Sequence, residues 1–170
     1  MAYEIFLLPV SPGADLEEAG EALLARLEGA TEVPGDPASD PALATAVAAV
    51  RAADRAIGPA PESPHPAAGG WPVPVVVLRG AHGIDVTVSR GFARFRVPFE
   101  HRGDDADAVF EGLFRMLAAV ADATGWHAYD PQEAERLPLD DGGRDATLEI
   151  YLTVMDQLRP DGALGGRRRG

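Results

Sequence analysis

The segment from residue 73 to residue 99 constrains the fold more than any other part of the chain. An apolar run at 73–79 is followed by two runs in which residues alternate between two faces, and short turns that contain glycine separate the three. A period of two is typical of a strand with one buried face, and turns this short join antiparallel neighbours. The segment therefore predicts an antiparallel meander with strands at 73–79, 84–89 and 92–99.

One face of this meander is expected to lie against the core and the other to face water. The side chains that share the expected core face are Ile84, Val86, Val88, Ala93, Phe95, Val97 and Phe99. The expected wet face carries Asp85, Thr87, Ser89, Phe92, Arg94 and Arg96.

Further strands and helices are predicted on both sides of the meander. Short apolar runs indicate buried strands at 3–10 and 126–130. Apolar residues at helical spacing indicate helices at 15–29, 40–58 and 104–125. The predicted N-caps of these helices are Asp15, Asp40 with Pro41 behind it, and either Asp104 or Asp105.

Two further segments have no clear helix or strand pattern. Residues 31–40 are expected to form a loop, because glycine and proline interrupt them. Residues 145–158 have apolar side chains at helical spacing, but their β-branched residues leave a strand open as an alternative.

Together these elements predict an α+β fold: a mainly antiparallel sheet of about five strands with helices packed mostly on one face. The length suits a single domain over residues 1–158. Within it, residues 58–72 are expected to form a Pro/Gly-rich loop, and residues 159–170 to form a flexible basic tail.

The composition limits the chemistry and the partners of the chain. There is no cysteine, which excludes disulfides and thiolate zinc sites and makes the cytoplasm the expected compartment. No stretch of about 18 apolar residues and no signal-like start occurs, so no membrane association is expected. The formal net charge of −12 disfavours nucleic acid as a partner. It would steer basic partners toward the chain, but the commoner role of an acidic surface is only to keep a protein soluble. All 15 basic side chains are arginine.

No motif of the chain predicts catalysis or a cofactor. The four histidines, at positions 65, 82, 101 and 127, lie in four different segments and match no zinc-binding spacing. The serines lack a nucleophile elbow, and the glycine pairs lack the strand-to-helix setting of a phosphate loop. The sequence therefore predicts no catalytic residue, no metal site and no cofactor.

Four residues are the candidates for binding a ligand or a partner: Arg94, Arg96, His127 and Tyr129. Two arginines on one face of a strand have the geometry to hold a carboxylate or phosphate. The alternative is that they pair with acidic side chains across the sheet, with Asp85 and Glu100 as the nearest choices. His127 and Tyr129 share a face of the strand at 126–130 and can be exposed or buried.

Three short stretches give the chain a resemblance to a protein family. They are MAYEIFLLPVSPG at 1–13, RFRVPF at 94–99 and AAVADATGWHAYDPQ at 118–132. Together they resemble an uncharacterised family of small bacterial proteins, with a Met-x-Tyr-acidic start and a Tyr-Asp-Pro-Gln motif near the C-terminus. The resemblance supports the element boundaries and implies no activity, cofactor or catalytic residue.

The expected function is that of a non-catalytic protein-interaction module, and its concrete form is a toxin-neutralising immunity-type protein. The net charge and the lack of a catalytic signature motivate this hypothesis. One alternative is a small-ligand-binding protein or enzyme with a pocket beside the sheet. The other is a structural or assembly subunit, for which a homo-oligomer is compatible with the sequence.

Overall fold

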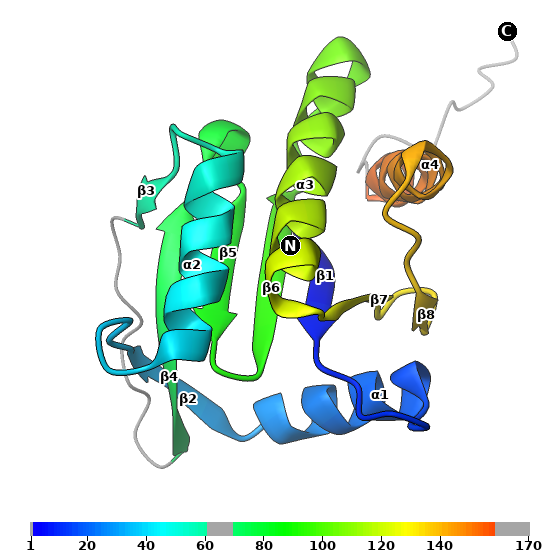
Figure 1. Ribbon diagram of the computed structural model, residues 1–170. Coiled ribbons are helices and arrows are strands. Elements are labelled where there is room, and N and C mark those ends of the chain that lie inside the picture. Colours follow the sequence, from blue (N-terminus) through cyan, green and yellow to red (C-terminus); the bar gives the residue numbers. More distant parts are fainter. Residues whose placement is uncertain (1, 61–69, 159–170) are drawn as a thin grey trace, which may run out of the picture.

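The computed structural model describes residues 2–60 and 70–158, and these form an α+β architecture (Figure 1). The described strands make one mostly antiparallel sheet in the order β2-β4-β5-β6-β1-β7-β8, with β3 also beside β4. The longer strands are β1 (Ala2–Leu8), β2 (Ala30–Pro34), β4 (Trp71–Arg79), β5 (Asp85–Ser89), β6 (Phe92–Pro98) and β7 (His127–Asp130). Two short strands are β3 (Gly58–Pro59) and β8 (Glu135–Arg136). The helices are α1 (Leu16–Leu27), α2 (Pro41–Ala53), the 3-10 turn η1 (Ala81–Gly83), α3 (Gly103–Thr124) and α4 (Asp141–Gln157).

The predicted meander is confirmed. β4, β5 and β6 pair antiparallel in sequence order, and β1 then lies between β6 and β7. In this register Arg96 is opposite both Asp85 and Glu4, whereas Phe6 separates Arg94 from Tyr129. The register therefore sets which of the candidate side chains can meet.

The sheet has more strands than the predicted number of about five, since the described residues form eight. β2 occupies part of the predicted loop at 31–40 and runs parallel to β4, so that prediction is wrong there. Its pairing joins segments separated by α2, and no local pattern signals such a contact. β3 and β8 have two residues each, too few to show any alternation.

Helices cover both faces of the sheet, but three of the four described α-helices lie on one face, in rough agreement with the prediction. α2, α3 and α4 pack on one face, which we call the major face, and Figure 1 shows α2 and α3 side by side over the strands. α1 packs on the opposite, minor face. The alternation in β1 separates two cores, with Ile5 and Leu7 on the major face and Phe6 and Leu8 on the minor face.

The minor face is not wet along its whole length, contrary to the prediction. Thr87, Ser89 and Phe92 are only 2%, 4% and 3% exposed. Phe92 belongs to the apolar cluster to which α1 contributes Leu23. The alternation is therefore as predicted, but α1 turns one end of the polar face into a second core.

The helix boundaries follow the caps. The carboxylates of Asp15 and Asp40 accept hydrogen bonds from the first backbone N–H groups of α1 and α2, as predicted. α2 ends at Ala53, earlier than predicted. Neither Asp104 nor Asp105 caps α3: Arg102 is the N-cap residue, and both acids lie in the first turn. The alternative at 145–158 is resolved, because these residues lie in α4 or directly follow it.

The prediction for 58–72 is wrong at its ends, because Gly58–Pro59 and Trp71–Pro72 lie in strands. Residues 61–69 of that predicted loop and the predicted tail at 159–170 lie outside the described residues.

Gly20 lets α1 approach the sheet. A Cβ atom at this position would lie 2.6 Å from ring carbons of Tyr129. Gly20→Ala is expected to destabilise the fold by about 1–3 kcal/mol through overpacking, despite the better helix propensity of alanine. Urea unfolding measures this change. Gly112→Ala in α3 is the matched control, because open space surrounds that position and alanine should stabilise it by up to about 1 kcal/mol. Equal effects at both glycines would contradict the close packing.

Candidate functional site

The four predicted binding residues lie on the minor face, and the two arginines are engaged within the chain. Arg94 Nη2 lies 2.6 Å from Glu32 Oε1 and also donates to Thr87 Oγ1 over 3.4 Å. Glu32 belongs to β2, the strand that the sequence does not predict, and Glu32 is therefore a partner that was not expected.

Arg96 belongs to a row of alternating charges that crosses four neighbouring strands. Its Nε lies 2.9 Å from Glu4 Oε1, and the next pair in the row, Arg79 with Asp85, is bidentate at 2.6 and 2.9 Å. The acidic partner of Arg96 is therefore Glu4 and not the expected Asp85, which pairs with Arg79. Pairs of this kind, partly exposed, contribute about 0–1 kcal/mol each.

His127 and Tyr129 share the minor face as predicted but do not meet the arginines. Tyr129 is 1% exposed and lies beneath Gly20, where burial raises the pKa of its phenol. His127 is half-buried at the start of β7, and its Nδ1 accepts a hydrogen bond from Arg136 Nη2. Phe6 lies between Tyr129 and Arg94 in the sheet, so the structure does not gather the four residues into one site.

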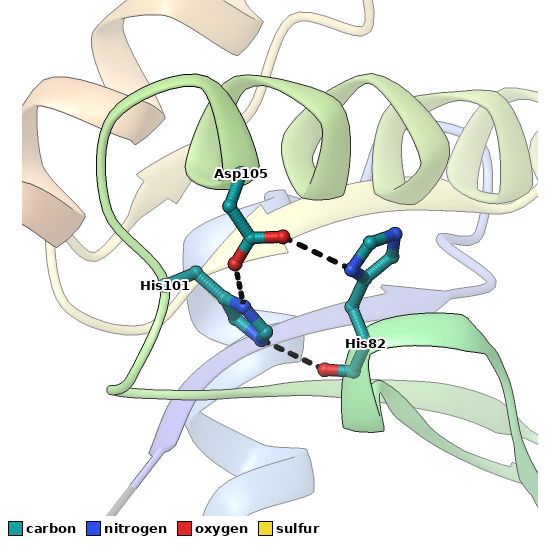
Figure 2. A group of neighbouring side chains, drawn as sticks. All are labelled: His82, His101 and Asp105. Carbon is teal, nitrogen blue, oxygen red and sulfur yellow. Dashed lines mark hydrogen bonds and ion pairs between the residues drawn. The ribbon is translucent and has the colours of Figure 1, made fainter.

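A cluster that the sequence analysis missed lies at the other end of the meander, where η1, the connection before α3 and the first turn of α3 come together. Figure 2 shows the side chains of His82, His101 and Asp105 pointing toward one another. His101 Nδ1 lies 2.6 Å from Asp105 Oδ2, and His82 Nδ1 lies 3.2 Å from Asp105 Oδ1. His101 Nε2 is 2.7 Å from the backbone oxygen of His82. We call these three residues the His-His-Asp cluster.

The cluster combines a buried anchor with two exposed side chains. His101 is 6% exposed, whereas the side chains of His82 and Asp105 are 42% and 50% exposed. The hydrogen bond from His101 is the first cause that holds the pKa of Asp105 below its usual value, and the charges of His101 and His82 add to it. Asp105 is therefore an ionised carboxylate facing two imidazoles.

Tyr151 of α4 fixes the backbone that carries His101. Its hydroxyl accepts hydrogen bonds from the backbone N–H groups of Glu100 and His101, at 3.2 and 3.1 Å, and donates to the backbone oxygen of Pro98 at 2.6 Å. Burial raises the pKa of this phenol, although the two donated N–H bonds oppose the rise. The connection between β6 and α3 is thus held by a core side chain.

A second candidate site is an apolar groove between α1 and the sheet, with a volume of about 230 Å³. It is lined by Leu23, Arg26 and Leu27 of α1, residues 71–74 at the start of β4, and residues 89–92 at the β5–β6 turn. Trp71 is 42% exposed there, its Nε1 donates to the backbone oxygen of Arg26, and the Arg26 guanidinium lies 5.6 Å from the ring centroid. We call it the Trp71 groove.

The two sites differ in how much sequence signal they have. His101 and Asp105 are four residues apart and span the start of a helix, which is a local hint of contact. His82 is 19 residues before His101 and belongs to another element, so only the fold reveals the third member. The Trp71 groove has little signal in the sequence. Trp71 lies in a segment predicted as a loop, and the sequence does not predict which face of the sheet α1 covers.

No helix within residues 2–60 and 70–158 combines the length and apolar character that a membrane crossing requires. Comparison of the chain with protein-family models, with curated proteins and with solved structures found no match in any of the three. The resemblance of its short motifs to an uncharacterised bacterial family therefore stays a prediction.

Proposed function

We propose that the chain is a non-catalytic protein-interaction module that holds one apolar side chain of a basic partner protein in the Trp71 groove. The observation that carries the proposal is the exposed ring of Trp71 at the wall of an apolar groove. Trp71 and Leu158 are the large apolar side chains that the described part of the chain exposes, and of these two Trp71 lines the groove.

The size of the groove favours a side chain over a whole ligand. Pockets for small molecules have volumes of about 300–1,000 Å³, whereas the Trp71 groove has about 230 Å³. Tryptophan and arginine are also the residues that most often dominate the binding energy of protein interfaces. The proposed occupant is therefore an aliphatic or aromatic side chain on a partner surface.

The charge of the chain as a whole favours a basic partner, although the charged residues that line the groove itself are Arg26 and Arg90. Beyond the groove lining, α1 exposes Glu17, Glu18 and Glu21, and Glu28 follows its end. The net charge of the chain is −12. Such a field speeds the approach of a positively charged protein and weakens with salt. A cytoplasmic toxin-neutralising protein is the concrete form of this proposal, since its partner would be an enzyme of opposite charge.

Trp71→Ala is expected to weaken the affinity for the partner at least tenfold, because the mutation removes the exposed wall of the groove. The partner is captured from the host organism on the immobilised full chain, identified, and then purified for calorimetric titration. Leu158→Ala is the matched control, because Leu158 is exposed to the same extent, 42%, but lies just beyond α4. Its affinity should equal that of the wild type.

Two results would overturn the proposal: equal affinities for Trp71→Ala and wild type, or an affinity that does not fall as salt concentration rises.

The alternative of a small-ligand-binding protein predicts instead that a small molecule competes with the partner for the groove. The alternative of an assembly subunit rests on the predicted loop and tail, most of which lie outside the described residues.

A further inference from the structure

We propose that the His-His-Asp cluster is a binding site for one divalent transition-metal ion, with Zn²⁺ as the best match to its donors. The site is independent of the Trp71 groove, because Trp71 begins β4 and η1 follows the end of the same strand. The spacing of the histidines in the sequence predicts no metal site, and the proposal rests on the tertiary arrangement alone.

The ligand atoms of the cluster converge. One atom each from His82, His101 and Asp105 lies within 4.8 Å of the other two. The backbone oxygen of His82 only accepts hydrogen bonds, so His101 Nε2 carries the proton that it donates there. His101 Nδ1 faces the Asp105 carboxylate over 2.6 Å, and His82 Nδ1 faces it over 3.2 Å. A proton or a metal ion can join each nitrogen to the carboxylate.

One of the two distances matches a metal site and the other is shorter. Zn²⁺ binds imidazole nitrogen and carboxylate oxygen at about 2.1 Å, which places tetrahedral ligand atoms about 3.4 Å apart. His82 Nδ1 and Asp105 Oδ1 are 3.2 Å apart, whereas His101 Nδ1 and Asp105 Oδ2 are 2.6 Å apart, a hydrogen-bond distance. Metal binding therefore requires Asp105, an exposed side chain, to move away from His101 Nδ1. Imidazole and carboxylate ligands suit Zn²⁺ and its neighbours in the first transition row.

The surroundings of His101 are those of a metal ligand. A histidine that binds a metal commonly donates its other ring N–H to a carbonyl or carboxylate, which fixes the tautomer and the ring orientation. His101 donates to the His82 carbonyl in this way, and the hydroxyl of Tyr151 holds its backbone N–H. The buried ligand is therefore preorganised.

His82 adds a second sign of a built site. Its backbone φ is +58°, in the left-handed region that residues other than glycine seldom adopt. Such a conformation costs free energy, and strained residues cluster at functional sites. Here it places the His82 carbonyl on one nitrogen of His101 and the His82 ring on Asp105, so one residue contributes both a support and a ligand.

The exposed side of the cluster leaves a position for a further ligand. A zinc ion with three protein ligands keeps its fourth position for water or substrate. A cavity of about 160 Å³ lies beside His82, between the end of α2, η1 and α3. The carboxylate of Glu100 lies 3.9 Å from His101 Nε2 and adds negative charge that favours a cation.

The competing explanation is a purely structural clasp, in which protons alone join the two imidazoles to Asp105 and tie the start of α3 to η1. The two explanations differ in their response to metal. Titration of the untagged, chelator-treated full chain with Zn²⁺ is expected to show one strong site by calorimetry. Co²⁺ should give visible absorption bands from the same site, and both metals should raise the Tm.

Two variants of exposed ligands test the assignment without touching the buried ring. His82→Asn removes an imidazole but keeps a residue that tolerates the left-handed backbone, and Asp105→Asn keeps the shape of the side chain. Each is expected to weaken Zn²⁺ at least tenfold and to abolish the Co²⁺ bands. His127→Asn is the matched control and should bind as the wild type does, because His127 pairs with Arg136 away from the cluster.

The proposal is overturned if the wild type shows no saturable one-to-one binding at millimolar Zn²⁺. It is also overturned if His82→Asn and Asp105→Asn keep wild-type affinity. Either result would leave the clasp as the role of the cluster and would not affect the proposal for the Trp71 groove.

Discussion

Above pH 10 the free energy of unfolding is expected to fall steeply, approaching a loss of about 4 kcal/mol per pH unit. All three tyrosines of the chain are buried, with exposures of 1% for Tyr3, 1% for Tyr129 and 0% for Tyr151. Burial is the largest cause that raises the pKa of each phenol in the folded state. At Tyr3 the hydrogen bond to Asp130 and the charge of that carboxylate raise the pKa further.

Stability falls with rising pH because the phenolic protons leave the unfolded chain first. The unfolded chain releases its phenolic protons near the ordinary pKa of 10, while the folded chain keeps them. Stability is therefore complete below pH 10 and is lost as the pH rises toward the folded-state pKa values. Each tyrosine contributes up to about 1.4 kcal/mol per pH unit. The chain contains no lysine and no cysteine, so no other side chain titrates strongly in this range.

Urea unfolding at several pH values between about 9 and 12 measures the slope, and tyrosinate absorbance reports which state ionises. Tyr3→Phe should lower the limiting slope by about a third, because it removes one of three phenols. A stability that stays flat over this range, or tyrosinate absorbance from the folded protein near pH 10, would contradict the prediction.

Tyr151→Phe is expected to destabilise the protein by about 3 kcal/mol, although it removes a single oxygen atom. The hydroxyl of Tyr151 takes part in three hydrogen bonds with the backbone, at Pro98, Glu100 and His101. Each contributes about 1 kcal/mol, and the loss takes this partner from the buried N–H of His101. The N–H of Glu100 and the carbonyl of Pro98 keep the hydrogen bond that they make with each other. Urea unfolding at neutral pH measures the change.

Tyr129→Phe is the matched control, because Tyr129 is equally buried and also lies against a helix. Its expected effect is below about 1 kcal/mol. Because Tyr151 holds the backbone of His101, Tyr151→Phe should also weaken any Zn²⁺ binding at the His-His-Asp cluster. Similar losses of stability for the two variants would show that the backbone bonds of Tyr151 contribute little.

The sequence predicts local features of this fold well. An apolar run next to a glycine turn locates β4, the period-two runs locate β5 and β6, and the caps Asp15 and Asp40 locate the starts of two helices. Each of these signals acts within a few residues of itself, through side-chain alternation or a hydrogen bond to the next backbone N–H groups. β2 is missed because its partner β4 lies beyond α2 in the chain.

In the candidate sites, too, the sequence predicts local features but not contacts between distant segments. Arg94, Arg96, His127 and Tyr129 do share one sheet face, as their strand positions predict. Their partners come from distant segments, since Glu32 reaches Arg94 from β2 and Gly20 of α1 lies over Tyr129. No spacing in the sequence reports such contacts.

The sequence by itself determines the charge of this protein, the absence of lysine and cysteine, and which side chains alternate across the meander. The tertiary structure alone decides that α1 buries one end of the second face, that all three tyrosines lose contact with water, and that His82 meets His101 and Asp105. The physical reason is range: backbone geometry and capping act between neighbours in the chain, whereas burial and side-chain convergence depend on packing between elements that the chain order does not place together.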